Sequence, residues 1–266
     1  MCLILFGFRS HRHFPLVVAA NRDEQYKRPA APAAFWNDHP EIYGGRDLEK
    51  GGTWMGLHRN GRFAAITNFR EGLPKAAAPR SRGELVSGFL AGSDSADEFF
   101  RTATERQSEY NAYSMIAGDL DELRFQSNRG NAVLTITPGV HGLSNHLLDT
   151  PWPKVTAGIN AVESTRLLDD PDAISARLFD LLSSRSAAVD ARLPDTGIDR
   201  QRERELSPAF IAGEHYGTRT STVLLVHASG DVFVHEKRFG PDGLPMGEDA
   251  RAFRLRQPAT RAAVSG

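Results

Sequence analysis

Short apolar runs separated by polar turns dominate the N-terminal part of the chain. The runs at 2–8 and 16–20 flank the polar segment RSHRHFP, which favours two paired, deeply buried strands over an amphipathic helix. The following segment, NRDEQYKRPAAPA, predicts a strand end that leads into a Pro-rich loop. Asn60-Gly61 then lies between TWMGLH and RFAAIT, and this dipeptide predicts a hairpin turn.

Helical spacing appears next, in RGELVSGFLAG and SADEFFRTATER, between 81 and about 106. The second segment opens with Ser95 and carries Glu98 three residues later, which predicts a capping box. Strands are predicted again in YSMIAGDLDELRFQSN, with a turn near 118–122, and in AVLTITPG.

In the C-terminal third, predicted helices are again followed by predicted strands. Helices are predicted at about 153–168 and 171–184, and a final hairpin is predicted about the turn Ser229-Gly230-Asp231. Hairpins that are segregated from helices favour an α+β layered domain over alternating βαβ units. We expect one domain over residues 1–256 and a frayed tail at 257–266, which is rich in Ala, Arg and Ser.

Composition narrows the class of protein. The chain has 266 residues, is 40% hydrophobic and 24% charged, and has a formal net charge of −1, so no basic field points to nucleic acid. Its single cysteine allows no internal disulfide and no cysteine-based zinc site, which fits a reducing compartment. No apolar run reaches the roughly 18 residues of a membrane span. We therefore expect a soluble, cytoplasmic protein without a metal site.

That single cysteine stands at position 2, where removal of Met1 would place a thiol and a free α-amine on one residue. A thiol attacks as the thiolate, and an α-amine that titrates at about 7.7–8.0 can take its proton. Cys2 is therefore a candidate N-terminal nucleophile. The alternative is an incidental small apolar side chain.

Polar residues end several of the predicted strands and supply candidate partners for the thiol. Arg22 can stabilise a thiolate and Asp23 can orient the α-amine, although a capping Asp and a solvated Arg are the structural alternative. Asn68 and Asn145 carry uncharged donors that suit an oxyanion hole, with turn residues as the alternative. Arg219 can bind a carboxylate or phosphate through two hydrogen bonds, or form a surface ion pair.

Five segments in this order carry a resemblance to a known family: MCLILFGF, AANRDE, GGTWMG, GLSNHLLDTPWPK and YGTRTSTV. Together they resemble the NRDE family, also called the transport and Golgi organisation protein 2 family, over residues 2 to about 240. The resemblance implies the N-terminal-nucleophile hydrolase fold, a four-layer αββα sandwich. The pattern is also similar to choloylglycine hydrolases and penicillin V acylases.

By this resemblance the catalytic residues are Cys2, Arg22, Asp23, Asn68 and Asn145. The chemistry implied is amide or acyl hydrolysis, or acyl transfer, through a Cys2 thioester, and it requires no cofactor. The hydrolases read Arg-Asn-x-Asp where this chain has an Arg directly followed by an Asp.

Three residues within these segments, Arg219, Trp54 and Asn21, are expected to contact the substrate. Trp54, Trp152 and Phe69 are candidates to line an apolar pocket, with core packing as the alternative.

The family also implies a competing function, a non-catalytic intracellular carrier of haem, acyl-CoA or another acyl lipid. For haem cargo, the candidate axial ligands are Cys2 and the histidines near the shared segments, His141, His146 and His215. The CxxCH motif of covalent haem attachment is absent from the sequence. Either function predicts a small-molecule ligand near Cys2.

Overall fold

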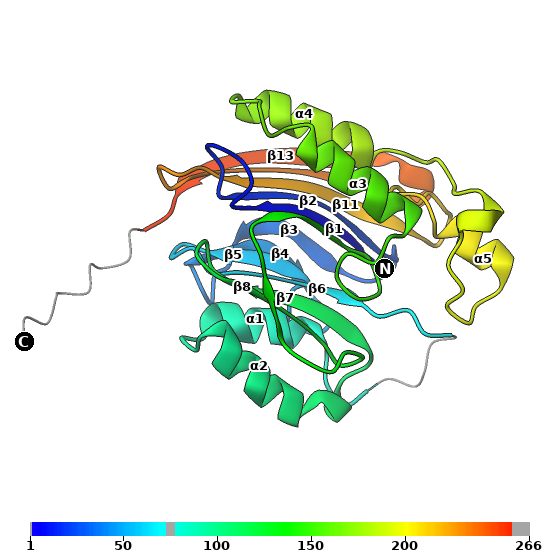
Figure 1. Cartoon of the computed structure of the whole chain (residues 1–266), viewed down its shortest axis with the longest axis horizontal. Coiled ribbons are helices and arrows are strands. Elements are labelled where there is room, and N and C mark those ends of the chain that lie inside the picture. The colour runs from blue at the N-terminus through cyan, green and yellow to red at the C-terminus, as the bar shows by residue number, and fades with distance from the viewer. Residues whose placement is uncertain (1, 73–77, 257–266) are drawn as a thin grey trace, which may run out of the picture.

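The computed structural model describes residues 2–72 and 78–256 and contains two stacked antiparallel sheets between two pairs of helices (Figure 1). One sheet has the strand order β10-β1-β2-β11-β12-β13. Its strands are β1 (Cys2–Phe8), β2 (Leu16–Gln25), β10 (Gly139–Leu143), β11 (Tyr216–Val226), β12 (Asp231–Phe239) and β13 (Pro245–Arg254).

The other sheet runs in chain order from β3 to β9. Its strands are β3 (Ala30–Phe35), β4 (Ile42–Asp47), β5 (Met55–His58), β6 (Phe63–Asn68), β7 (Tyr113–Gly118), β8 (Leu123–Ser127) and β9 (Leu134–Ile136). The helices are α1 (Gly83–Ala91), α2 (Ala96–Glu105), α3 (Pro153–Glu163), α4 (Pro171–Leu182) and the short α5 (Arg200–Glu205). Within the described ranges, no helix is long and apolar enough to cross a membrane.

Three apolar cores hold these layers together. Along β1, Ile4 and Phe6 point into the core between the two sheets, whereas Leu3 and Leu5 pack on α3 and α4. The other sheet packs its outer face on α1 and α2. Because both faces of β1 are buried, its sequence is a continuous apolar run without polar alternation. The layer order is αββα, so the four-layer architecture implied by the resemblance is confirmed.

The local predictions agree with the structure where a turn or cap is encoded nearby. The Asn60-Gly61 hairpin joins β5 to β6, and Gly61 has a φ of +94°, which favours glycine. Ser95 and Glu98 form the predicted capping box of α2. The final hairpin joins β11 to β12 as predicted.

Three predictions need correction. The prediction of a Pro-rich loop after β2 is wrong, because residues 30–35 form the edge strand β3. The register of β3 with β4 shifts between Ala31 and Ala34, and an edge strand with such an irregularity tolerates Pro32. The first C-terminal helix ends at Glu163, earlier than predicted. Strand β13 was not predicted, because its exposed sequence lacks apolar alternation. The predicted frayed tail, 257–266, and Met1 lie outside the described residues.

Candidate functional site

Strand alternation distributes the segment Asn21-Arg22-Asp23-Glu24 over the two faces of the first sheet. Cys2 at the start of β1 lies directly opposite Arg22 on β2, and both continue the row of side chains that faces the other sheet. The side chain of Asn21 points to the helix face, where its Nδ2 donates to the carbonyls of Leu182 and Ala209, both at 2.8 Å. Adjacent residues of this motif therefore act on opposite sides of the sheet.

A cavity of about 470 Å³ opens where Cys2 and Arg22 meet the second sheet and the start of α1. Cys2 is 8% exposed and forms part of its wall. Asn68, Trp54 and Arg219 also line this cavity, so the structure brings most of the predicted site residues together. Asn21 is not among the lining residues.

The environment of the thiol disfavours its thiolate form. Burial raises the pKa of Cys2, and the negative charge of Asp23 adds to the rise. Arg22 and a hydrogen bond from the backbone of Asp23 lower the pKa of Cys2, but burial dominates. Attack by this thiol therefore requires a base.

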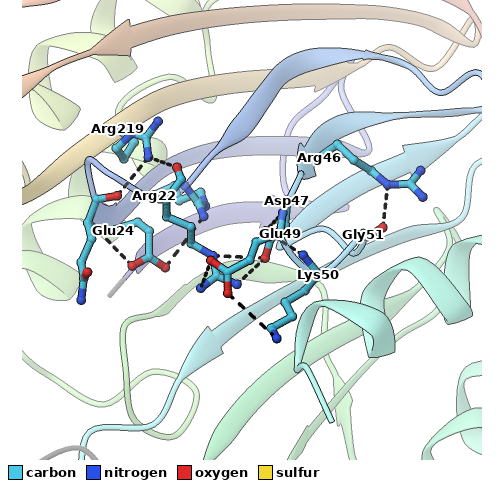
Figure 2. Close-up of polar contacts among 10 residues, drawn as sticks. Arg22, Glu24, Arg46, Asp47, Glu49, Lys50, Gly51 and Arg219 are labelled. Atoms are coloured by element: carbon cyan, nitrogen blue, oxygen red, sulfur yellow. Dashed lines mark hydrogen bonds and ion pairs between the residues drawn. The ribbon is translucent and has the colours of Figure 1, made fainter. Parts of the chain in front are cut away.

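Arg219 reaches the cavity because of a β-bulge. In the pairing of β11 with β2, Thr218 lies opposite Asp23 and Thr220 lies opposite Arg22, so Arg219 is the extra residue. Its Nη1 donates to the carbonyls of Gln25 at 3.0 Å and Arg28 at 2.6 Å. Figure 2 shows Arg219, Arg22 and Glu24 grouped together, whereas Arg46 turns toward Gly51.

Asn145 links the two sheets beside Cys2. It adopts a left-handed conformation with φ of +56°, which Asn tolerates, and its Nδ2 donates to the carbonyl of Asn68 at 3.0 Å. The backbone carbonyl of Asn145 accepts a hydrogen bond from the backbone N–H of Arg70 at 2.8 Å. The neighbouring Ser144 donates its Oγ hydrogen to the backbone carbonyl of Cys2 at 3.1 Å. Asn145 thus positions the end of β6, and Asn68 carries the amide that lines the cavity.

Behind the sheet lies a buried ion cluster formed by Asp23, Arg70, Lys154 and Glu203, all at most 9% exposed. Arg70 pairs with Glu203 at 2.6 Å, and Thr218 Oγ1 donates to Asp23 Oδ1 at 2.7 Å. Lys154 Nζ donates to the carbonyl of Leu206 at 3.0 Å. Two cations and two carboxylates balance one another here.

This cluster influences the site through Asp23. Burial raises the pKa of the Asp23 carboxyl, and the positive charge of Lys154 opposes that rise. Burial lowers the pKa of Lys154 to about 8, and the carboxylate of Asp23 opposes that change. The sequence interpretation missed Arg70, Lys154 and Glu203. The one signal was that Lys154 ends the shared segment GLSNHLLDTPWPK.

Trp54 lines the cavity, whereas Trp152, Phe69 and the candidate histidines are not among the residues that line it. Trp152 is buried at the start of α3 with Arg70 over its ring, and Phe69 packs on His146 at 4.6 Å between ring centroids. Both ring nitrogens of His141 are hydrogen-bonded, to Asp149 and to the carbonyl of Thr137, and His215 is exposed. No histidine lines the described cavity. Of the proposed haem ligands, the cavity therefore contains Cys2.

Comparison with known proteins assigns this chain to a family. The sequence profile of the Transport and Golgi organisation 2 family matches residues 1–241. This chain belongs to that family. The transport and Golgi organization protein 2 homolog of Bos taurus is 37% identical over 280 residues, which cover 96% of this chain and 99% of the bovine protein.

Two solved structures are similar to this Transport and Golgi organisation 2 family member at low sequence identity. A conjugated bile acid hydrolase from Clostridium perfringens matches with a TM-score of 0.48 and 9% identity, over 96% of this chain and 92% of the hydrolase. The N-acylethanolamine-hydrolyzing acid amidase ortholog of Caenorhabditis elegans matches with a TM-score of 0.49 and 11% identity, over 84% and 92% of the two chains.

The five segments that carry the resemblance converge in space. They supply Cys2 from β1, Arg22 from β2, Trp54 before β5, Asn145 after β10 and Arg219 from β11. All of these residues lie at the cavity or in direct hydrogen-bond contact with a residue that lines it. The segments that carry the resemblance thus all contribute a residue to the candidate site or to its direct support.

Proposed function

We propose that this protein is a cysteine-dependent acyl-transfer enzyme, an amide or acyl hydrolase or an acyltransferase, with Cys2 as its nucleophile. The observation that carries the proposal is the position of Cys2, whose thiol lies in the wall of a 470 Å³ cavity opposite Arg22. A buried thiol at the end of a strand, beside a cation and a strand-end amide, has the parts that acyl transfer needs.

In the proposed mechanism, loss of Met1 frees the α-amine of Cys2, and this amine accepts the thiol proton. Sγ then attacks the acyl carbonyl, and the oxyanion that forms accepts hydrogen bonds from the Asn68 amide and from backbone N–H groups. The tetrahedral intermediate collapses to a thioester, and the leaving group departs with the proton from the amine. Water or an acceptor alcohol, amine or thiol then attacks the thioester and regenerates Cys2.

Intact mass before and after incubation with an acyl-reactive probe tests this function. We expect a chain without Met1 that gains one acyl group, located on Cys2 by peptide mapping. Cys2→Ala should lose the adduct and all turnover while its circular dichroism spectrum is unchanged. Cys2→Ser, which keeps a weaker nucleophile, should retain a small residual rate.

Retained Met1 with no adduct would contradict the mechanism and would favour the competing carrier function. In that case, haem titration should shift the Soret band of wild-type protein but not that of Cys2→Ala, because Cys2 is the candidate axial ligand in the cavity wall. Acyl-lipid cargo would instead be detected as binding that leaves Cys2 unmodified.

A further inference from the structure

Among the described residues, six arginines line the cavity, and they divide into two groups by their partners. Arg28 donates to Asp47 at 2.6 Å, Arg46 binds both oxygens of Asp38 at 2.8 and 2.9 Å, and Arg238 pairs with Asp249. The other three are Arg22, Arg82 and Arg219. Within residues 2–72 and 78–256, these three make no hydrogen bond to a carboxylate.

These three arginines come from different elements and all line the cavity. Arg82 is the residue before α1 and uses Nη1 to donate to the carbonyl of Ala112 at 3.1 Å. Arg219 uses Nη1 in the same way, on two carbonyls. Arg22 makes one loose ion pair, with Glu24 at 3.8 Å. The hydrogen bonds of Arg82 and Arg219 hold each guanidinium through Nη1, and among the described residues the Nε and Nη2 donors have no hydrogen-bond partner.

Burial disfavours the charged form of two of these arginines, Arg82 and Arg219. Burial lowers the pKa of Arg82 and also that of Arg219, and the like charge of Arg22 lowers the pKa of Arg219 further, although the negative charge of Glu24 opposes both changes. Desolvated like charges repel, and an anion placed among them removes that cost. Guanidinium groups match the planar, two-oxygen geometry of carboxylate and phosphate.

We propose that Arg82 and Arg219, together with Arg22, form an anion subsite that holds a carboxylate or phosphate group of the ligand beside Cys2. The substrate is then an acyl compound with an anionic group in its acyl or leaving part. The acyl half of this statement rests on the proposed function, whereas the anion subsite does not.

Anion binding to the full-length Cys2→Ala protein tests the subsite without any chemistry. Calorimetric titration with inorganic phosphate, and separately with glutarate, should give saturable binding. Arg82→Gln should weaken it by about tenfold or more, because a charge-assisted hydrogen bond is lost. Arg46→Gln is the matched control: it removes the same charge from the same cavity, but Arg46 is already bound to Asp38, and we expect less than a twofold change.

Phosphate binding without glutarate binding would assign a phosphate ester, and the reverse would assign a carboxylate. If neither anion binds, or if Arg82→Gln and Arg46→Gln weaken anion binding equally, the proposed subsite is contradicted. Thermal unfolding of both variants checks that each is folded. Arg82→Lys keeps the positive charge but loses the planar pair of guanidinium donors, so it should bind the anion with intermediate affinity. Anion binding in a protein whose Cys2 never acylates would refute the enzyme and leave the subsite standing.

Discussion

Two groups of charged residues lie on either side of the same strand ends, and they are built differently. On the helix face, the buried ion cluster holds Arg70 against Glu203 and places Lys154 near Asp23, so cations and carboxylates are equal in number. On the cavity face, Arg22, Arg82 and Arg219 lack carboxylate hydrogen bonds within the described part of the chain. The first group is complete by itself, whereas the second has within the described residues only the loose ion pair of Arg22 with Glu24 at 3.8 Å.

This contrast indicates which charged residues stabilise the fold and which are available to bind a ligand. A buried charge whose partner is present stabilises one arrangement of the fold, and loss of one partner leaves the other charge uncompensated. A cation whose hydrogen bonds go only to backbone carbonyls adds less to stability, about 1 kcal/mol per bond, and its charge is available to a ligand. The structure therefore predicts that stability and binding respond to substitutions on opposite faces of the sheet.

The largest effect is expected in the ion cluster. Arg70→Leu should lower the free energy of unfolding by about 3–5 kcal/mol, because it leaves Glu203 buried without its cation. Arg82→Leu, on the cavity face, should cost about 1 kcal/mol, since it removes one hydrogen bond to a backbone carbonyl. Urea denaturation of the two variants measures both changes. Equal losses of unfolding free energy in the two variants would contradict the distinction between the helix face and the cavity face.

An intermediate effect is expected at Asn21, which the sequence assigned to the substrate. Its amide binds the carbonyls of Leu182 and Ala209 and accepts from Ser221 Oγ at 2.6 Å. Asn21→Ala should therefore destabilise the fold by roughly 2 kcal/mol through unsatisfied buried groups and leave the acylation of Cys2 unchanged.

Asn68→Ala is the counterpart on the cavity face. It should slow acylation of Cys2 with little loss of stability, because within the described residues the Asn68 side chain makes no hydrogen bond. Denaturation and adduct formation, measured side by side, separate the two variants. A stable Asn21→Ala protein with weakened substrate binding would instead support the assignment made from the sequence.

The smallest effect is expected in the titration of the thiol. Because burial raises the pKa of Cys2, its alkylation by uncharged iodoacetamide should accelerate with pH and still be rising at about pH 9. Arg22 stabilises the thiolate, so Arg22→Gln should move this rise to higher pH and slow alkylation at a fixed neutral pH by roughly three- to tenfold. Arg46→Gln is the control and should leave the profile in place. A profile that moves to lower pH in Arg22→Gln would contradict the contact.

Much of the fold was readable from local signals. Asn60-Gly61 encodes its own hairpin, Ser95 and Glu98 encode the start of α2, and the apolar run 2–8 encodes a strand buried on both faces. Strand β3 was missed because the tolerance for Pro32 depends on its place at a sheet edge, and an edge is a property of the whole sheet.

The sequence by itself determined which residues are candidates for chemistry, Cys2 with the strand-end Arg22 and Asp23, and that residues 1–241 match the family. Only the tertiary structure decided how they are used. Alternation along β2 sends Arg22 and Asn21 to opposite faces, and a bulge brings Arg219 to the cavity. The pairing of Arg70 with Glu203 joins residues 133 positions apart. Such contacts depend on which layers cover each face, and no local pattern in the chain encodes that.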